Sequence, residues 1–142
     1  MTNSEPFDAM NLFDLADELR DRVSQGETVT EATLEEISVD YSLPISDVYA
    51  SLAMCPEVSL STGYPTTVKV CVGRCQFSGG AGLLRGLLEL RKAKDYKIGV
   101  LPTPCLDRCD DAPVMSSQGK SGSYCHPKVD MAGLEELIEA IM

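Results

Sequence analysis

Four cysteines in two pairs carry the clearest chemical signal in this chain of 142 residues. Cys71 and Cys75 form the first pair and Cys105 and Cys109 the second, with three residues between the members of each pair. This spacing allows a single turn or loop to present both thiolates toward one point. Two such loops held side by side could therefore bind one metal centre.

The chain around these pairs must bring the two loops together. Residues 67–72 are rich in β-formers and predict a strand that ends close to Cys71. A predicted helix follows, indicated by leucines at helical spacing, and residues 96–101 predict a second strand that Pro102 is expected to end. Both cysteine loops would then follow strand ends at one edge of a sheet, where ligands bind in open α/β folds.

The rest of the C-terminal part completes a small α/β domain. Residues 114–117 and 121–125 flank a turn-rich link and predict an antiparallel hairpin. Residues 131–141 predict a helix with one apolar and one acidic face. The resulting order, β-α-β-β-β-α, is that of the thioredoxin-like fold. We therefore predict an α/β protein whose residues 63–142 form a thioredoxin-like domain.

Residues 1–62 are predicted to form a helical segment of about three helices. Thr30 is a suitable N-cap for the second helix, and Pro44 suits the first turn of the third. Helices this short are not stable alone and must pack on each other or on a partner. The predicted buried positions are Leu12, Leu15, Ala16, Leu19 and Val23 in the first helix, Leu34, Ile37 and Tyr41 in the second, and Val48, Tyr49, Leu52 and Ala53 in the third.

The charge balance limits the class of partner. The chain has 12 Lys and Arg residues against 22 Asp and Glu residues, a net charge of −10, which repels nucleic acids and anionic membrane surfaces. No apolar run approaches the roughly 20 residues that span a bilayer, so we expect no direct membrane insertion. The N-terminus has neither a secretory nor a transit pattern, and a cytoplasmic location is predicted. Thiols stay reduced there, so the six cysteines favour metal or redox chemistry over structural disulfides.

Four thiolates are compatible with a [2Fe–2S] cluster, a [4Fe–4S] cluster or a zinc ion. Two features favour iron. The loops follow strands, whereas zinc ribbons normally use hairpin knuckles with two-residue spacers, and Gly79, Gly80 and Gly82 leave backbone amides near the sulfurs that stabilise a negative cluster. A Rieske centre needs two histidines and is excluded, because the chain has only His126.

The remaining cysteines and the histidine receive simpler interpretations. Cys55 and Cys125 lie outside the pattern and are predicted to be buried free cysteines that behave as small hydrophobic residues, with a place for Cys125 near the cluster as an alternative ligand left open. His126 is predicted to be a surface polar residue. Neither a P-loop nor a glycine-rich dinucleotide motif occurs, so any nucleotide would have to be bound by a partner.

The sequence resembles a known family over nearly its whole length. The residues that carry the resemblance are Cys105, Cys109, Ala112 and Pro113, the run Tyr124-Cys-His-Pro127 before the terminal helix, and the run from Leu43-Pro44 to Tyr49. In these positions the chain is similar to the thioredoxin-like [2Fe–2S] ferredoxin subunit of NADH dehydrogenase, the NuoE family. Related subunits serve NAD-linked hydrogenases, formate dehydrogenases and bifurcating complexes.

The resemblance implies that Cys71, Cys75, Cys105 and Cys109 ligate a [2Fe–2S] cluster. It further implies a non-catalytic electron-transfer subunit in a hetero-oligomer, beside a partner subunit that binds FMN and NAD(H). Two alternatives remain open: a zinc-stabilised structural adaptor for such a complex, and a stand-alone thioredoxin-like ferredoxin.

Overall fold

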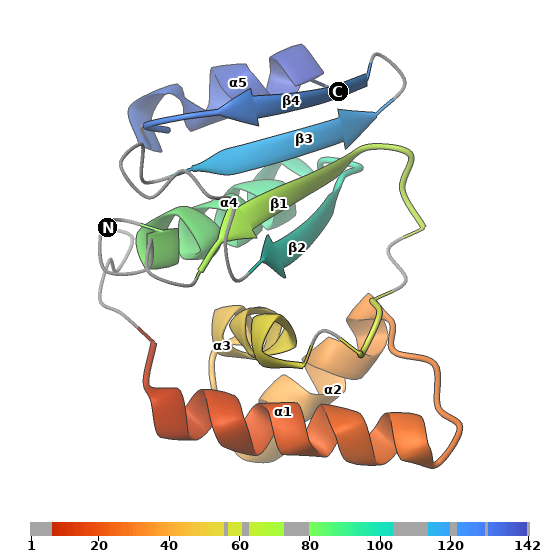
Figure 1. Cartoon of the computed structure of the whole chain (residues 1–142). Coiled ribbons are helices and arrows are strands. Elements are labelled where there is room, and N and C mark those ends of the chain that lie inside the picture. The colour runs from red at the N-terminus through yellow and green to blue at the C-terminus, as the bar shows by residue number, and fades with distance from the viewer. Residues whose placement is uncertain are drawn as a thin grey trace.

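The chain forms a mixed α/β structure (Figure 1). The computed structural model describes residues 7–55, 57–60, 63–72, 80–103, 114–119, 122–129 and 131–141. The N-terminal elements are α1 (Ala9–Ser24), α2 (Glu31–Tyr41), α3 (Ile45–Ser51) and the short 3-10 helix η1 (Leu52–Met54). They are followed by β1 (Thr67–Cys71), α4 (Gly80–Lys94), β2 (Gly99–Thr103), β3 (Met115–Gly119), β4 (Gly122–His126), the 3-10 helix η4 (Met131–Gly133) and α5 (Leu134–Ile141).

The four strands form one mixed sheet in the order β2-β1-β3-β4. β1 is parallel to β2 and antiparallel to β3, and β3 is antiparallel to β4. Within the described residues the predicted order of elements after residue 63 is confirmed, and the first strand, predicted over residues 67–72, ends at Cys71. The parallel pair is continued beyond β1 by a hydrogen bond of 2.9 Å from the Val72 amide to the Thr103 carbonyl.

The second strand lies later in the chain than predicted. Residues 96–101 were expected, but β2 runs from Gly99 to Thr103 and includes Pro102. The Gly99 amide donates to the Thr66 carbonyl beside β1, so the alternate residues of β2 direct their amides toward β1. Pro102 lies between these positions on the outer strand of the sheet, so its missing N–H would point away from β1 and removes no ladder bond.

The hairpin is confirmed, but its turn is displaced. Gln118 and Gly119 were predicted in the turn and instead belong to β3, where Gln118 pairs with Thr67 on one side and Ser123 on the other. Pairing on both sides extends β3, and Gly119 opposite Gly122 closes the hairpin. Helix α4 buries the predicted leucines, Leu83, Leu84, Leu87 and Leu88. The last helix was predicted over residues 131–141, but α5 begins at Leu134 after the 3-10 helix η4, and it buries Leu134 and Ile138.

The three predicted N-terminal helices are present. Thr30 caps α2 as expected, because its hydroxyl accepts from the Thr33 amide while the Thr33 hydroxyl accepts from the Thr30 amide. Two predicted core positions are wrong: Val23 and Tyr41 are 39% and 41% exposed. Both residues lie in the last turn of a helix. Helix α1 has 16 residues and packs on α3, which has only seven, so the end of α1 with Val23 extends beyond this contact.

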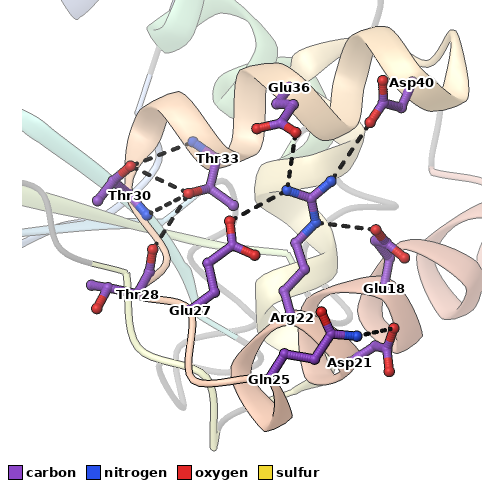
Figure 2. A network of polar contacts seen from close by, with 10 residues as sticks. All are labelled: Glu18, Asp21, Arg22, Gln25, Glu27, Thr28, Thr30, Thr33, Glu36 and Asp40. Carbon is purple, nitrogen blue, oxygen red and sulfur yellow. Dashed lines mark hydrogen bonds and ion pairs between the residues drawn. The ribbon is translucent and has the colours of Figure 1, made fainter.

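A single arginine joins the first two helices (Figure 2). Arg22 on α1 donates to Glu18 at 3.0 Å and lies 3.5 Å from both Glu27 and Glu36 and 3.6 Å from Asp40. Only 13% of its side chain is exposed. This cation offsets carboxylates from α1, from α2 and from the connection between them, and so holds the two helices together despite their acidic surface.

The buried apolar side chains of the helices and of the sheet belong to one contiguous cluster. α3 and η1 contact β2, and α3 also contacts α4. The division into residues 1–62 and 63–142 remains a prediction. Among the described residues, no helix has both the length and the apolar character needed to cross a membrane.

Candidate metal centre

Cys71 is the predicted ligand that the structure describes, and it lies at the end of β1. Its side chain is buried, with 1% exposed. On one side Cys71 pairs with Thr103, the last residue of β2. On the other side its amide donates to the carbonyl of Val114 at 3.3 Å.

The two neighbours of Cys71 enclose the second cysteine pair in the sequence. Residues 104–113, which include Cys105 and Cys109, begin directly after Thr103 and end directly before Val114. The chain therefore leaves the sheet on one side of Cys71 and returns to it on the other. The strands that precede the two predicted cysteine loops, β1 and β2, are adjacent and parallel, so their C-terminal ends lie at one edge of the sheet, as the sequence predicted.

α4 begins at Gly80, directly after the residues that contain Cys75. Gly80 and Gly82 were expected in a loop near the sulfurs, but both are buried residues of the first turn of α4. The N-terminal end of this helix, with its partial positive charge, follows residues 73–79 directly. A helix N-terminus in this place favours negative charge in the loop before it.

Cys75, Cys105 and Cys109 lie outside the described residues, so their assignment as ligands remains a prediction. Within the part of the chain that the structure describes, no group of three or more His, Cys, Asp or Glu side chains is placed to hold a metal ion.

The other two cysteines have different environments. Cys55 is fully buried, as predicted, and its Sγ lies 3.4 Å from the Ser51 carbonyl. Cys125 is exposed, so the prediction that it is buried is wrong. Cys125 pairs with Ser116, and Ser116 pairs with the exposed Lys69, so these three residues share one face of the sheet. The buried residues Val70 and Met115 lie on the opposite face. Cys125 thus faces the open side of the sheet, two strands away from Cys71.

We expect these two thiols to react very differently with an alkylating reagent. Burial raises the pKa of the Cys55 thiol to about 11, against the opposing effect of Arg20. At pH 8, brief iodoacetamide treatment followed by peptide mass mapping should show modified Cys125 and unmodified Cys55, with Cys55 reacting only after denaturation. Equal labelling of both in the native protein would contradict the burial of Cys55.

The same pKa predicts the sign of a pH effect on stability. The unfolded chain ionises Cys55 near its ordinary pKa of 9.0, before the folded protein does. The free energy of unfolding should therefore decrease as the pH rises from about 9 to 11. The Cys55→Ala variant should show a smaller decrease over this range in denaturant titrations.

His126 is of intermediate exposure, and its ring makes a polar contact within the sheet. Its Nε2 lies 2.9 Å from the Ser117 hydroxyl on β3. Burial lowers the pKa of the imidazole. The sequence analysis did not predict this contact. The register of the hairpin would have revealed it, because His126 is opposite Met115 and therefore diagonal to Ser117 on the neighbouring strand.

No protein-family model matches this chain, and no curated protein shows a significant match to it. The functional argument therefore depends on the residues and on the geometry described above.

Proposed function

We propose that this chain is an electron-transfer subunit that carries one [2Fe–2S] cluster and exchanges electrons with the flavin- and NAD(H)-binding subunit of an oxidoreductase complex. Cys71, Cys75, Cys105 and Cys109 would ligate the cluster. A bound cluster of this kind accepts and releases single electrons. The chain itself would hold the cluster and present it to the partner, without substrate chemistry of its own.

One observation carries the proposal. Cys71 lies at the end of β1 between Thr103 and Val114, the residues directly before and after the segment that contains Cys105 and Cys109. Cys105 follows Thr103 by two residues, a length of chain that spans at most about 7 Å. Neighbouring strands lie about 4.8 Å apart. These lengths allow a thiolate two residues beyond Thr103 to share one centre with the thiolate of Cys71.

The fold supports the same assignment. A parallel βαβ unit, an antiparallel hairpin and a closing helix, with strand order β2-β1-β3-β4, agree with the thioredoxin-like domain inferred from the sequence. The buried Cys71 side chain and the helix N-terminus that follows the first loop fit a negatively charged cluster better than a solvated site.

The partner is the one that the resemblance to the NuoE family implies, and the motifs and charge of the sequence are compatible with it. Since no phosphate-binding glycine motif occurs in the chain, we place FMN and NAD(H) on the partner subunit. The net charge of −10 favours a protein partner over nucleic acid. Reduced thiols are also required to build the cluster, which is consistent with a cytoplasmic protein.

The proposal is tested by purifying the full chain under anaerobic conditions and measuring iron, zinc and acid-labile sulfide. We expect equal amounts of iron and sulfide, a visible absorption band that dithionite bleaches, and an EPR signal of the reduced protein. NADH should reduce the cluster only when the flavin subunit is added. Zinc in place of iron would instead support a structural adaptor.

A further inference from the structure

The two outer strands of the sheet differ in what lies beside them. α3 and η1 contact β2, whereas β4 forms the opposite end of the sheet and is exposed from Gly122 to Cys125. β4 consists of Gly, Ser, Tyr, Cys and His, so it has none of the proline, lysine or acidic side chains that commonly protect an outer strand from pairing. Its outer side is therefore suited to pair with a further strand.

The register of the sheet shows which backbone groups of β4 face outward. The Cys71 amide donates to the carbonyl of Val114, directly before β3, so the even-numbered residues of β3 bond to β1 and its odd-numbered residues bond to β4. These odd-numbered residues pair with the even-numbered residues of β4. The N–H and C=O groups of Ser123 and Cys125 therefore point away from the sheet, and no other described backbone group bonds to them.

A second copy of the same strand complements these groups. When two β4 strands pair antiparallel about a two-fold axis at Tyr124, Ser123 of each copy faces Cys125 of the other, and each of these pairs can form two hydrogen bonds. An axis at Cys125 would place Ser123 opposite Pro127, which has no N–H, and an axis at Ser123 would place Cys125 opposite residue 121, outside β4. The axis at Tyr124 therefore allows the most backbone hydrogen bonds.

The same axis covers the exposed ring of Tyr124. In the single chain 52% of this residue is exposed. On the axis the two Tyr124 residues form a non-hydrogen-bonded pair, in which the Cα atoms are about 4.5 Å apart and the side chains are close. Aromatic pairs at such cross-strand positions are favourable, so pairing removes from water an aromatic surface that the single chain leaves exposed.

The distribution of charge permits two copies to meet at β4. Residues 1–62 contain 13 acidic and two basic residues, a net charge of −11, whereas residues 63–142 contain nine acidic and ten basic residues, a net charge of +1. The acidic helices lie beside β2, at the end of the sheet opposite to β4 (Figure 1). In a pair joined through β4 the two β2 strands are roughly 30 Å apart. This separation is well beyond the Debye length of about 8 Å at physiological salt, so repulsion between the acidic segments is screened.

We propose that this protein forms a homodimer in which the β4 strands of two copies pair antiparallel and join the two sheets into one continuous sheet. The occupant of the exposed edge is thus a second copy of this chain. The contact consists of one strand pair and one tyrosine pair, so it is small, and we expect a dissociation constant on the order of 10–100 µM. This inference is independent of the proposed function, because none of the four predicted cluster ligands lies on β4.

Sedimentation of the full chain under reducing conditions tests the dimer from about 10 µM to about 1 mM, a range that includes the expected dissociation constant. The wild type should change from monomer to dimer. Tyr124→Lys places two like charges opposite each other on the axis and should weaken the dimer at least about tenfold. Cys125→Pro removes an outward N–H from each copy and should also weaken it. Circular dichroism checks that both variants fold, and Tyr124→Lys alone decides if Cys125→Pro does not.

A matched control is available on α1. Phe13→Lys makes the same change of charge at an aromatic side chain of nearly equal exposure, 53%. Because α1 belongs to the helices beside β2, this variant should dimerise as tightly as the wild type (Figure 1).

A cysteine on the two-fold axis tests the register. In the variant Tyr124→Cys/Cys125→Ser the two new thiols belong to residues whose Cα atoms are about 4.5 Å apart, which is within the range of a disulfide. Mild oxidation should therefore give a covalent dimer on a non-reducing gel. The variant Cys125→Ser, treated in the same way, should stay monomeric on the gel and accounts for the other cysteines.

Each outcome supports or overturns the inference. A wild-type chain that stays monomeric up to about 1 mM overturns it, even if another protein binds at β4. A dimer that Tyr124→Lys leaves as tight as the wild type shows that β4 is not the interface. Equal yields of covalent dimer from Tyr124→Cys/Cys125→Ser and from Cys125→Ser overturn the proposed register.

Discussion

Replacing Cys71 by serine is expected to remove nearly all of the bound iron and the EPR signal of the reduced protein. Cys71 is buried at the end of β1. A serine in its place would offer a hydroxyl instead of a thiolate, and β1 has no second cysteine that could replace the lost ligand. Mutation of a residue that only supports a metal ligand already costs about 10–100-fold in affinity. Loss of a ligand should cost more, and iron analysis with EPR would measure it.

Cys125→Ser is the matched control for this experiment. It makes the same chemical change at an exposed cysteine on the same sheet, two strands away from Cys71. Iron content and the EPR spectrum should stay those of the wild type. An unaltered spectrum in the Cys71→Ser variant would remove Cys71 from the ligand set and with it the strongest support for the cluster.

Replacing Arg91 by methionine should lower the free energy of unfolding by about 2–4 kcal/mol, because it leaves a partly buried carboxylate without its cation. Arg91 on α4 donates to the Glu31 carboxylate on α2, to the Tyr49 hydroxyl at 3.0 Å and to the Ile98 carbonyl at 3.2 Å. The Tyr49 hydroxyl in turn donates to Glu31 at 3.1 Å. Only 17% of the Arg91 side chain and 24% of the Glu31 side chain are exposed.

The comparison variants for this network come from the same helix. Lys94 on α4 pairs with Glu135 at 3.1 Å, but both side chains are about half exposed, so Lys94→Met should barely move the denaturation midpoint. The double variant Arg91→Met/Glu31→Gln should recover part of the stability, since no uncompensated carboxylate remains. A loss for Arg91→Met no larger than that for Lys94→Met would show that this network does not join α2 and α3 to α4.

Local pattern in the sequence was sufficient for the elements that carry the site. The β-forming residues over 67–72 predict β1, and in the structure Val68 and Val70 are buried while Lys69 is exposed. Leucine spacing likewise predicts α4. These features depend on nearest neighbours along the chain, which is why they are visible without the structure.

Features that depend on distant parts of the chain were not visible. The order of the strands decides that Cys71 lies between Thr103 and Val114, and that Cys125 faces solvent rather than the core. The contact of Arg91 with Glu31 crosses 60 positions of sequence. Neither a propensity nor a periodicity encodes such pairings, because they are settled only when the sheet and the helices pack together.

The place of Pro102 on β2 has a consequence for association between molecules. An outer strand with free backbone donors and acceptors can recruit a strand from another chain and begin aggregation. At Pro102 the outward side of β2 lacks one of those donors, so an incoming strand would find its hydrogen-bond ladder interrupted beside the end of the sheet that bears Cys71. The contacts of α3 and η1 with β2 act in the same direction, because they place helices beside a strand that could otherwise pair with another chain.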